Sequence, residues 1–242
     1  MVEIDRSLPL ATGLSYAAGL DYASRYGTAT NLVASVPSSV CGVGAEFVPA
    51  STPILSVTSG VLNVNTGTVA MWMRPNVASN HGAFTQWFDS DSARHAFFVN
   101  AGVGIQLYND GITSSFNSGS LWDTGKDMLC VVRYDKATST QELWINGLNV
   151  TRTSQSGTWG STALGTNVYI GSRFSASDAW NGAIYTTWIW TRMLADHEMW
   201  NLYNPSTRWS LYRPMTRRVF SVVVSGGGGG GGSRRIYAGI VG

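Results

Sequence analysis

Residues 128–151 decide the fold, and they read Met-Leu-Cys-Val-Val-Arg-Tyr-Asp-Lys-Ala-Thr-Ser-Thr-Gln-Glu-Leu-Trp-Ile-Asn-Gly-Leu-Asn-Val-Thr. The apolar run at 128–134 is typical of a buried strand, and a second β-like run covers 141–145. Asn146-Gly147 then separates this run from 148–151. Asn-Gly between two such runs is the strongest local signal for a β-hairpin, because a type I′ turn needs positive φ at both central residues. The stretch therefore predicts antiparallel strands.

More short strands are predicted on both sides of this hairpin. Residues 68–74 are apolar on both faces, as expected of an inner strand that is covered on both sides, and Pro75 ends the run. The one helical candidate is 195–203, where apolar residues recur at i, i+3 and i+4 and two acids occupy the first turn. The remaining predicted strands are 43–48, 83–88, 96–100, 104–108, 168–172 and 183–190. Many short strands with little helical periodicity predict an all-β, two-sheet antiparallel sandwich.

The composition agrees with a sheet protein that buries a sizeable core. Hydrophobic residues make up 44% of the 242 residues and charged residues 12%, about half the usual charged share. Ten Trp and ten Tyr fit pleated, half-buried surfaces. Two Cys do not make a disulfide framework, and Cys130 lies within a predicted buried strand. We expect no secretion signal, because acids occupy the first residues, and no membrane span, because no long apolar run exists.

Charge divides the chain into a mildly acidic body and a basic end. Residues 199–242 hold six Arg, no Lys and no acid, whereas residues 1–198 hold ten basic and 14 acidic residues, a net charge of −4. Residues 226–232 are seven consecutive Gly, which predict a flexible linker. We therefore predict an N-terminal arm at 1–41 that is irregular and packs on the sandwich, a sandwich at 42–205 and a basic anchoring tail at 206–242. Such a tail suits an acidic protein surface or nucleic acid, and its apolar residues favour protein.

Residues 42–205 resemble laminin-G-like domains of the concanavalin A-like superfamily, through phrases that occur in the family's order. These are 67–75 (GTVAMWMRP), 129–135 (LCVVRYD), 142–147 (ELWING), 169–172 (YIGS) with 180–185 (WNGAIY), and 192–198 (RMLADHE) with 202–205 (LYNP). The resemblance implies a jelly roll. The sequence departs from the family at Tyr185, where an acid is usual, and at Ala195, where Ser caps the helix. The rim Asp residues of calcium-binding members have no match here.

The flanks resemble laminin-G-like virion proteins of tailed bacteriophages. The resemblance lies in Pro-Leu-x-x-Gly-Leu at 9–14, a short Asn-Leu-Val phrase at 31–33, and Trp-x-Leu-Tyr-x-Pro followed by Arg-Arg at 209–218. It implies a protein that is made in the host cytoplasm and ends in the virion as a capsid decoration, head-fibre or tail component. The expected partners are a viral capsid or tail protein and further copies of the chain, as a homo-oligomer, with no nucleic acid and no membrane.

No catalytic residue, metal site or cofactor is predicted. Glycoside hydrolases on this fold use paired carboxylates, and the laminarinase-like Glu-x-Asp-x-x-Glu run is absent. Asp89 and Asp91 lie in a predicted turn, and Asp196 and Glu198 start the predicted helix. His81, His95 and His197 have no metal spacing, and the seven Gly lack the Gly-Lys-Ser/Thr of a phosphate loop. We therefore expect that the chain is not an enzyme, although carboxylates on separate strands can still meet in space.

Two functions remain open, a structural virion protein and a lectin-like carbohydrate-binding module without catalysis. In the structural role, Arg suits interface ion pairs better than Lys, and the chain has 14 Arg and two Lys. The predicted anchoring residues are Trp209, Tyr212, Arg217, Arg218, Arg234 and Arg235. In the second role, sugar faces stack on exposed aromatic rings. The predicted contacts with a surface glycan are Trp122, Trp159 and Trp180, with packing in the core as the alternative for each.

Overall fold

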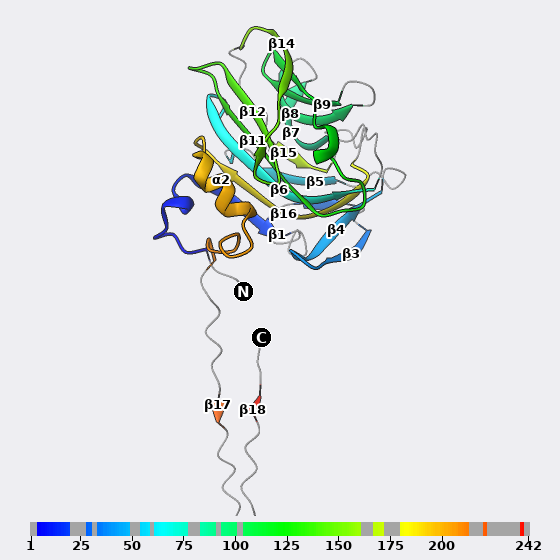
Figure 1. Cartoon of the computed structure of the whole chain (residues 1–242), viewed down its shortest axis with the longest axis vertical. Coiled ribbons are helices and arrows are strands. Elements are labelled where there is room, and N and C mark those ends of the chain that lie inside the picture. The colour runs from blue at the N-terminus through cyan, green and yellow to red at the C-terminus, as the bar shows by residue number, and fades with distance from the viewer. Residues whose placement is uncertain are drawn as a thin grey trace, which may run out of the picture.

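A computed structural model of the chain contains two antiparallel sheets packed face to face, with one short α-helix, α2 (Asp196–Tyr203), on the outside (Figure 1). The structure describes residues 4–19, 28–30, 33–48, 54–58, 61–76, 83–90, 93–100, 104–160, 167–171, 180–212, 220–221 and 238–239. Within these residues, the predicted all-β jelly roll and its short C-terminal helix are confirmed.

The first sheet contains the segment that decided the prediction. Its order is β13 (Leu148–Asn149), β12 (Thr140–Ile145), β11 (Met128–Asp135), β6 (Thr66–Pro75), β16 (Gly182–Trp190), β4 (Gly42–Phe47) and β3 (Val33–Ser38). β1 (Leu14–Gly19) also pairs with β16, along the half of β16 that β4 leaves free. In the β12–β13 turn, φ is 51° at Asn146 and 78° at Gly147, so the predicted Asn-Gly hairpin is confirmed.

The second sheet has the order β14 (Arg152–Gly157), β10 (Ile112–Phe116), β9 (Gly104–Asn109), β8 (Ala93–Asn100), β7 (Ala83–Ser90), β15 (Asn167–Ile170), β5 (Ile54–Thr58) and β2 (Thr28–Thr30). The chain crosses from the first sheet to the second between β13 and β14, at residues 150–151. These edge strands of the two sheets are therefore joined by only two residues, which brings the edges together at one side of the sandwich.

The central strands of the first sheet are buried on both faces, which explains why β6 is apolar on both sides. Met71 and Met73 point into the main core between the sheets, whereas Ala70 and Trp72 belong to a second core on the outer face. β11 and β16 alternate in the same way. The outer core is completed by the 3-10 helix η1 (Pro9–Ala11), by α2 and by a C-terminal segment that ends in Leu211, which has no exposed surface.

The N-terminal 40 residues contain more regular structure than predicted. The irregular arm was a wrong prediction for the described part, because η1, β1, β2 and β3 form there. β1 pairs with β16 from Leu14↔Trp190 to Gly19↔Thr186. Backbone pairing in the sheet therefore makes this segment a strand, although its Ser- and Ala-rich sequence carries no strand pattern. β10, β14, the 3-10 helix η4 (Gly119–Leu121) and β5 were also not predicted.

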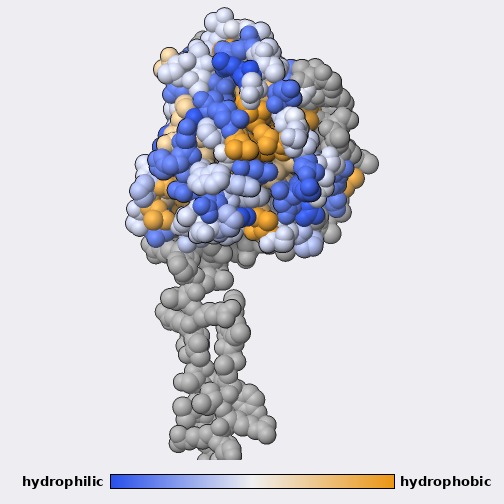
Figure 2. Space-filling model, viewed as in Figure 1, coloured by the Kyte–Doolittle hydropathy of each residue, from blue (hydrophilic) through white to orange (hydrophobic). Residues whose placement is uncertain are grey.

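The C-terminal region is described only in part. There, β17 (Phe220–Ser221) pairs with β18 (Ala238–Gly239). The seven Gly and Arg217, Arg218, Arg234 and Arg235 lie outside the described residues. Among the described helices, none is long and apolar enough to cross a membrane. The face in Figure 2 is mostly hydrophilic, with apolar residues in separate small patches.

Candidate functional site: a polar cleft at the sandwich edge

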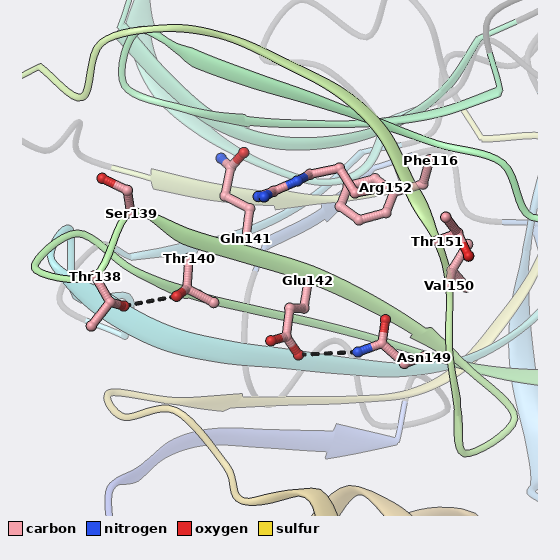
Figure 3. A pocket seen from close by; sticks show the side chains of 10 residues that line it. All are labelled: Phe116, Thr138, Ser139, Thr140, Gln141, Glu142, Asn149, Val150, Thr151 and Arg152. Carbon is pink, nitrogen blue, oxygen red and sulfur yellow. Dashed lines mark hydrogen bonds between the residues drawn. The ribbon is translucent and has the colours of Figure 1, made fainter.

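A cleft of about 320 Å³ opens where the edges of the two sheets meet. Its walls come from the end of β10, the turn before β12, β12 itself and the crossing from β13 to β14 (Figure 3). Thr138, Ser139, Thr140, Asn149 and Thr151 line it with hydroxyl and amide groups. In Figure 1, β14 and the turn before β12 lie at the end of the sandwich away from the C-terminal segment that reaches Tyr212.

The cleft exists because β13 is short. β13 pairs with only Trp144 and Ile145 of β12, and one more backbone bond follows, from the Val150 N–H to the Leu143 carbonyl at 2.8 Å. The chain then leaves for the other sheet at Arg152. In the described part of the chain, the beginning of β12 has no strand partner on this side, so its edge faces the cleft.

The inner wall of the cleft carries a buried amide. Strand alternation turns Gln141 toward the second sheet, and only 2% of its surface is exposed. Its Oε1 accepts a hydrogen bond from the hydroxyl of Ser114 on β10, a residue with no exposed surface. Its Nε2 is buried and has no hydrogen-bond partner in the described structure. A buried amide donor without a partner costs free energy, about 1–3 kcal/mol, and is therefore a feature that calls for an explanation.

Arg152 projects into the cleft from the opposite sheet. The pairing between β10 and β14 shifts register between Ser115 and Phe116, so a β-bulge lies where Arg152 begins its strand. A bulge re-aims the neighbouring side chain. Figure 3 shows the Arg152 guanidinium extending toward the amide of Gln141, with the ring of Phe116 close by. Arg152 is exposed, and no carboxylate among the described residues pairs with it.

Glu142 is the one carboxylate that lines the cleft, and it is already engaged. Its Oε2 accepts bonds from Arg133 Nε at 2.7 Å, from Trp144 Nε1 at 3.0 Å and from Asn149 Nδ2 at 3.5 Å. Arg133 Nη2 also lies 2.6 Å from the same oxygen and 2.8 Å from Asp196 Oδ1. Glu142 therefore belongs to a local ion-pair network on the outer face of the first sheet.

The three Trp predicted to contact a glycan do not gather at this cleft. Trp180 has no exposed surface and packs in the main core, so its ring offers no face to a sugar, and that prediction is corrected. Trp122 is half-buried and meets Trp180 edge to face, with 6.0 Å between ring centroids. Trp159 is half-buried near Tyr134, with 6.4 Å between centroids. The strand partners of this region place Trp159 and Trp180 at opposite ends of β6.

The predicted anchoring residues that the structure describes pack against the chain's own sandwich. Trp209 lies 6.0 Å from Trp188 between ring centroids, and Trp188 Nε1 donates to the Tyr212 hydroxyl at 2.8 Å. Both Trp209 and Tyr212 are half-buried. Their contact with an outside partner stays a prediction.

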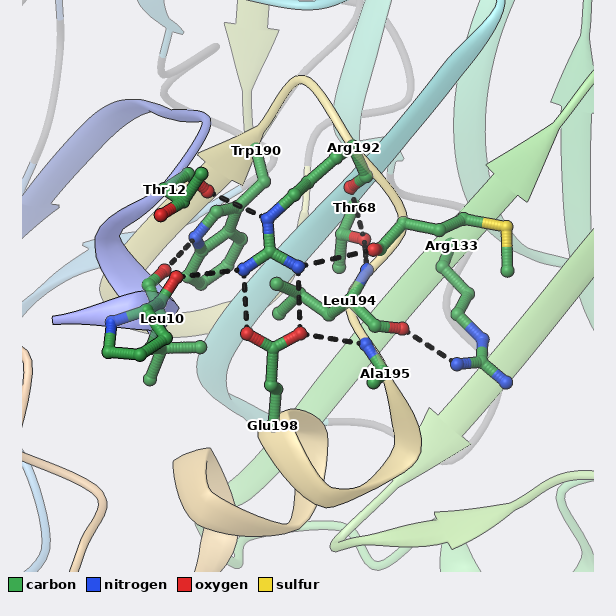
Figure 4. A network of polar contacts seen from close by, with 11 residues as sticks. Leu10, Thr12, Thr68, Arg133, Trp190, Arg192, Leu194, Ala195 and Glu198 are labelled. Carbon is green, nitrogen blue, oxygen red and sulfur yellow. Dashed lines mark hydrogen bonds and ion pairs between the residues drawn. The ribbon is translucent and has the colours of Figure 1, made fainter.

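A polar network fixes the N-terminal segment to the start of α2 (Figure 4). Arg192 and Glu198 make two parallel bonds of 2.7 and 2.6 Å, and Arg192 Nε donates to the Thr12 carbonyl at 2.8 Å. The Ala195 N–H donates to Glu198 Oε2 at 2.9 Å, which is half of a capping box without the usual Ser. Burial acts to raise the pKa of Glu198, but the bonds from Arg192 and Ala195 outweigh it and lower that pKa below its ordinary 4.5.

Sequence reasoning missed every residue that gives the cleft its character. Ser114, Gln141 and Arg152 come from three strands, and no spacing in the sequence joins them. Trp200 was also overlooked as a surface ring, although 47% of it is exposed beside the hairpin at Gly147. In the described part of the chain, no three His, Cys, Asp or Glu side chains are grouped so that they could hold a metal ion.

The family follows from a match over most of the sandwich. The family model Laminin_G_3, described as the concanavalin A-like lectin/glucanases superfamily, matches residues 50–199. The chain belongs to this family. The suspected laminin-G-like identity of the sandwich is thereby confirmed. Among curated proteins, none matches the sequence.

Solved structures similar to this concanavalin A-like domain include carbohydrate-binding ones. Domain 4 of AbnA, a GH43 extracellular arabinanase from Geobacillus stearothermophilus, was solved in complex with arabinotriose; it is 14% identical, covers 79% of this chain and 98% of its own, and has a TM-score of 0.58. The Ruminococcus gnavus IT-sialidase CBM40 bound to α2,3-sialyllactose is 11% identical. The match covers 79% of this chain and 100% of the CBM40 chain, with a TM-score of 0.51.

A third similar structure is a sialidase from Trypanosoma rangeli. It is 12% identical, with a TM-score of 0.52, and the match covers 72% of this chain but 29% of the sialidase. At these identities the similarities establish the fold alone.

Proposed function

We propose that this concanavalin A-like domain is a non-catalytic carbohydrate-binding module and that the edge cleft is its binding site. The observation that carries the proposal is the Gln141 amide, which is buried in the cleft wall with its Nε2 donor unpaired. Other buried polar atoms in the described structure also lack a partner, among them Trp72 Nε1 and Asn109 Nδ2, but Gln141 is the one of them that lines the cleft, where a ligand can supply the missing acceptor. Sugar hydroxyls and carboxylates are such acceptors.

The rest of the lining suits an oligosaccharide rather than an apolar ligand. Hydroxyl and amide side chains from Thr138, Thr140, Asn149 and Thr151 surround the opening, and Phe116 is the one aromatic residue. Apolar ligands prefer sites lined mainly by hydrophobic side chains, which this cleft lacks. The complexes of similar structures with arabinotriose and sialyllactose support the same class of ligand for this fold.

The carboxylates support binding without hydrolysis. Glycoside hydrolysis on most folds needs two carboxyl groups that flank the scissile bond. Among the residues that line the cleft, Glu142 is the one acid, and Arg133, Trp144 and Asn149 occupy its Oε2. An acid held in this way is poorly placed to act as a nucleophile or to give up a proton.

Blocking the cleft tests the proposal. Thr151→Trp places a large ring at an exposed rim position, so the chain should fold and glycan binding should fall at least tenfold. The control is Thr124→Trp, at an exposed turn position outside the cleft, which should leave binding unchanged. Binding is measured on a glycan array and then by calorimetry, with circular dichroism as the check on folding. An array without any bound glycan, or equal binding by both variants, would contradict this function.

A structural role in a tailed-bacteriophage particle is a second proposal, and it is compatible with the first. One observation favours it: Ile4 bridges to Tyr212, and the Asp5 N–H donates to the Leu211 carbonyl at 2.8 Å. The N-terminal segment and Tyr212, within the predicted basic tail, thus meet on one side of the sandwich, while β14, which begins at the cleft residue Arg152, lies at the other end (Figure 1). A tail anchored to a capsid or tail protein would leave the cleft free to reach a surface glycan.

Removing residues 213–242 tests this second role. The cut follows Tyr212 because Leu211 is fully buried and Trp209 packs on Trp188, so a cut after Pro205 would also damage the outer core. The truncated chain should fold, keep its glycan binding and fail to enter the particle. Normal incorporation of the truncated chain into virions would contradict the role. The mass of the full chain in solution tests whether it forms the predicted homo-oligomer.

A further inference from the structure

The charges around the cleft are unbalanced. Arg152 and Glu142 are the two ionised residues that line it. Glu142 is held by Arg133 through bonds of 2.7 and 2.6 Å to one oxygen, so its charge is compensated outside the cleft. Arg152 has no carboxylate partner among the described residues. The charge that the cleft presents to a ligand is therefore positive.

The hydrogen-bonding groups at the inner end of the cleft offer donors to a ligand rather than acceptors, which also favours an anion. The Oε1 of Gln141 is used by the Ser114 hydroxyl, which leaves the Nε2 as the free group of that amide. A guanidinium only donates hydrogen bonds. Figure 3 shows the Arg152 guanidinium directed from one sheet toward the Gln141 side chain of the other. A cleft in which both of these groups offer donors fits a ligand group that only accepts.

We propose that the cleft selects anionic oligosaccharides, with the Arg152 guanidinium and the Gln141 Nε2 donating to the oxygens of one carboxylate or sulfate group. This inference rests on the proposed carbohydrate-binding function and adds the substrate class. Guanidinium suits both anions, because its planar fork matches their paired oxygens. A neutral sugar hydroxyl at the same place gains no charge-assisted bond, so it binds more weakly.

The test compares glycans that differ in one charged group. The probes are lactose, 3′-sialyllactose and 3′-sulfolactose, together with tetragalacturonate and its methyl ester. The full-length chain should bind at least one acidic glycan about ten times more tightly than the matching neutral glycan. Added salt should reduce this difference in affinity. The carboxylate and sulfate probes distinguish the two sources of the anion.

Substitution of the guanidinium assigns the preference to one residue. Arg152→Gln removes the charge and keeps a polar side chain at an exposed position, so the variant should fold normally and its preference for acidic over neutral probes should fall about tenfold. Arg152→Lys should retain part of the preference. The matched control is Lys126→Gln, which removes one exposed positive charge at the other end of β11 and should change nothing.

The outcomes separate this inference from the function on which it rests. Equal binding of acidic and neutral probes by the unaltered chain, or an unchanged preference in Arg152→Gln, would overturn the selection of anions and leave carbohydrate binding intact. Absence of binding to every probe and every array glycan would overturn both.

Discussion

The outer face of the first sheet and the edge cleft differ in how their charged groups are paired. On the outer face, Trp190 Nε1 donates to the Leu10 carbonyl at 2.8 Å, and Arg192 divides its donors between Glu198 and the carbonyls of Pro9 and Thr12. In the cleft, the Gln141 amide is half satisfied and Arg152 has no ion-pair partner among the described residues.

The difference separates residues that stabilise the fold from residues that are available to a ligand. The outer face joins the N-terminal segment, α2 and the C-terminal segment through a continuous apolar core. Its Arg192–Glu198 pair and the Trp190 N–H are bonded within the chain, and its other buried polar atoms, such as Trp72 Nε1 and the Tyr185 hydroxyl, lie within the apolar core rather than in a cleft. The cleft keeps its donors free, which is typical of a binding site that accepts a cost in stability.

The largest effect on stability is expected from Trp190→Ala. Trp190 has no exposed surface and fixes η1 through its indole N–H, so its loss should reduce the free energy of unfolding by about 3–5 kcal/mol. Urea denaturation measures the change. Trp200→Ala is the control, since 47% of that residue is exposed, and it should cost about 1 kcal/mol or less. Equal costs for both variants would mean that the outer face is not a true core.

Glu198→Gln should have an intermediate effect that depends on pH. At pH 7 it should cost about 1–3 kcal/mol, because it weakens two charge-assisted bonds to Arg192. The pKa of Glu198 is lowered in the folded state, so the carboxylate stabilises the fold above its ordinary value of 4.5 and loses this effect as the pH falls through the folded value.

The stability gap between Glu198→Gln and the unaltered protein should therefore close in acid, as measured by urea denaturation from pH 7 to pH 3. Asp196→Asn serves as the control, because that carboxylate is 71% exposed and should contribute about 0.5 kcal/mol or less. A gap that stays constant down to pH 3 would contradict the role of the ion pair.

The smallest effect on stability is expected inside the cleft. Gln141→Leu combined with Ser114→Ala removes both partners of a buried bond together with the unpaired Nε2, so stability should stay equal or rise by up to about 1 kcal/mol. Glycan binding should fall at the same time. Gln141→Leu alone strands the buried Ser114 hydroxyl and should cost about 1–2 kcal/mol. A marked loss of stability in the double variant would show that the pair serves the fold.

The sequence predicted the fold where burial leaves a pattern. β6 and β11 are apolar on both faces because cores lie on both sides, and Asn146-Gly147 adopts the positive φ that its turn needs. Prediction failed for β14, in which every residue is exposed, so no alternation marks it. Prediction also failed for β1, because its Ser-, Ala- and Gly-rich sequence has no strand pattern and becomes a strand through backbone pairing with β16.

The site was predicted less well than the fold. Trp180 was identified as a ligand contact from its residue type, but its ring is buried in a core, as are those of Trp72, Trp188 and Trp190. Gln141 and Arg152 are ordinary polar residues in the sequence, and only the two-residue crossing between the sheets makes them neighbours across the cleft. Residues that meet through topology leave no local pattern.

The bridge between Ile4 and Tyr212 has a consequence for how this unit can be joined to other polypeptides. Because the first and last segments of the sandwich lie side by side, residues 4–212 form an almost closed circuit of chain. A unit of this kind tolerates insertion into a surface loop of another protein, since its entry and exit demand little space. The same geometry permits circular permutation, with new ends at the exposed turn of residues 123–126 and the cleft preserved.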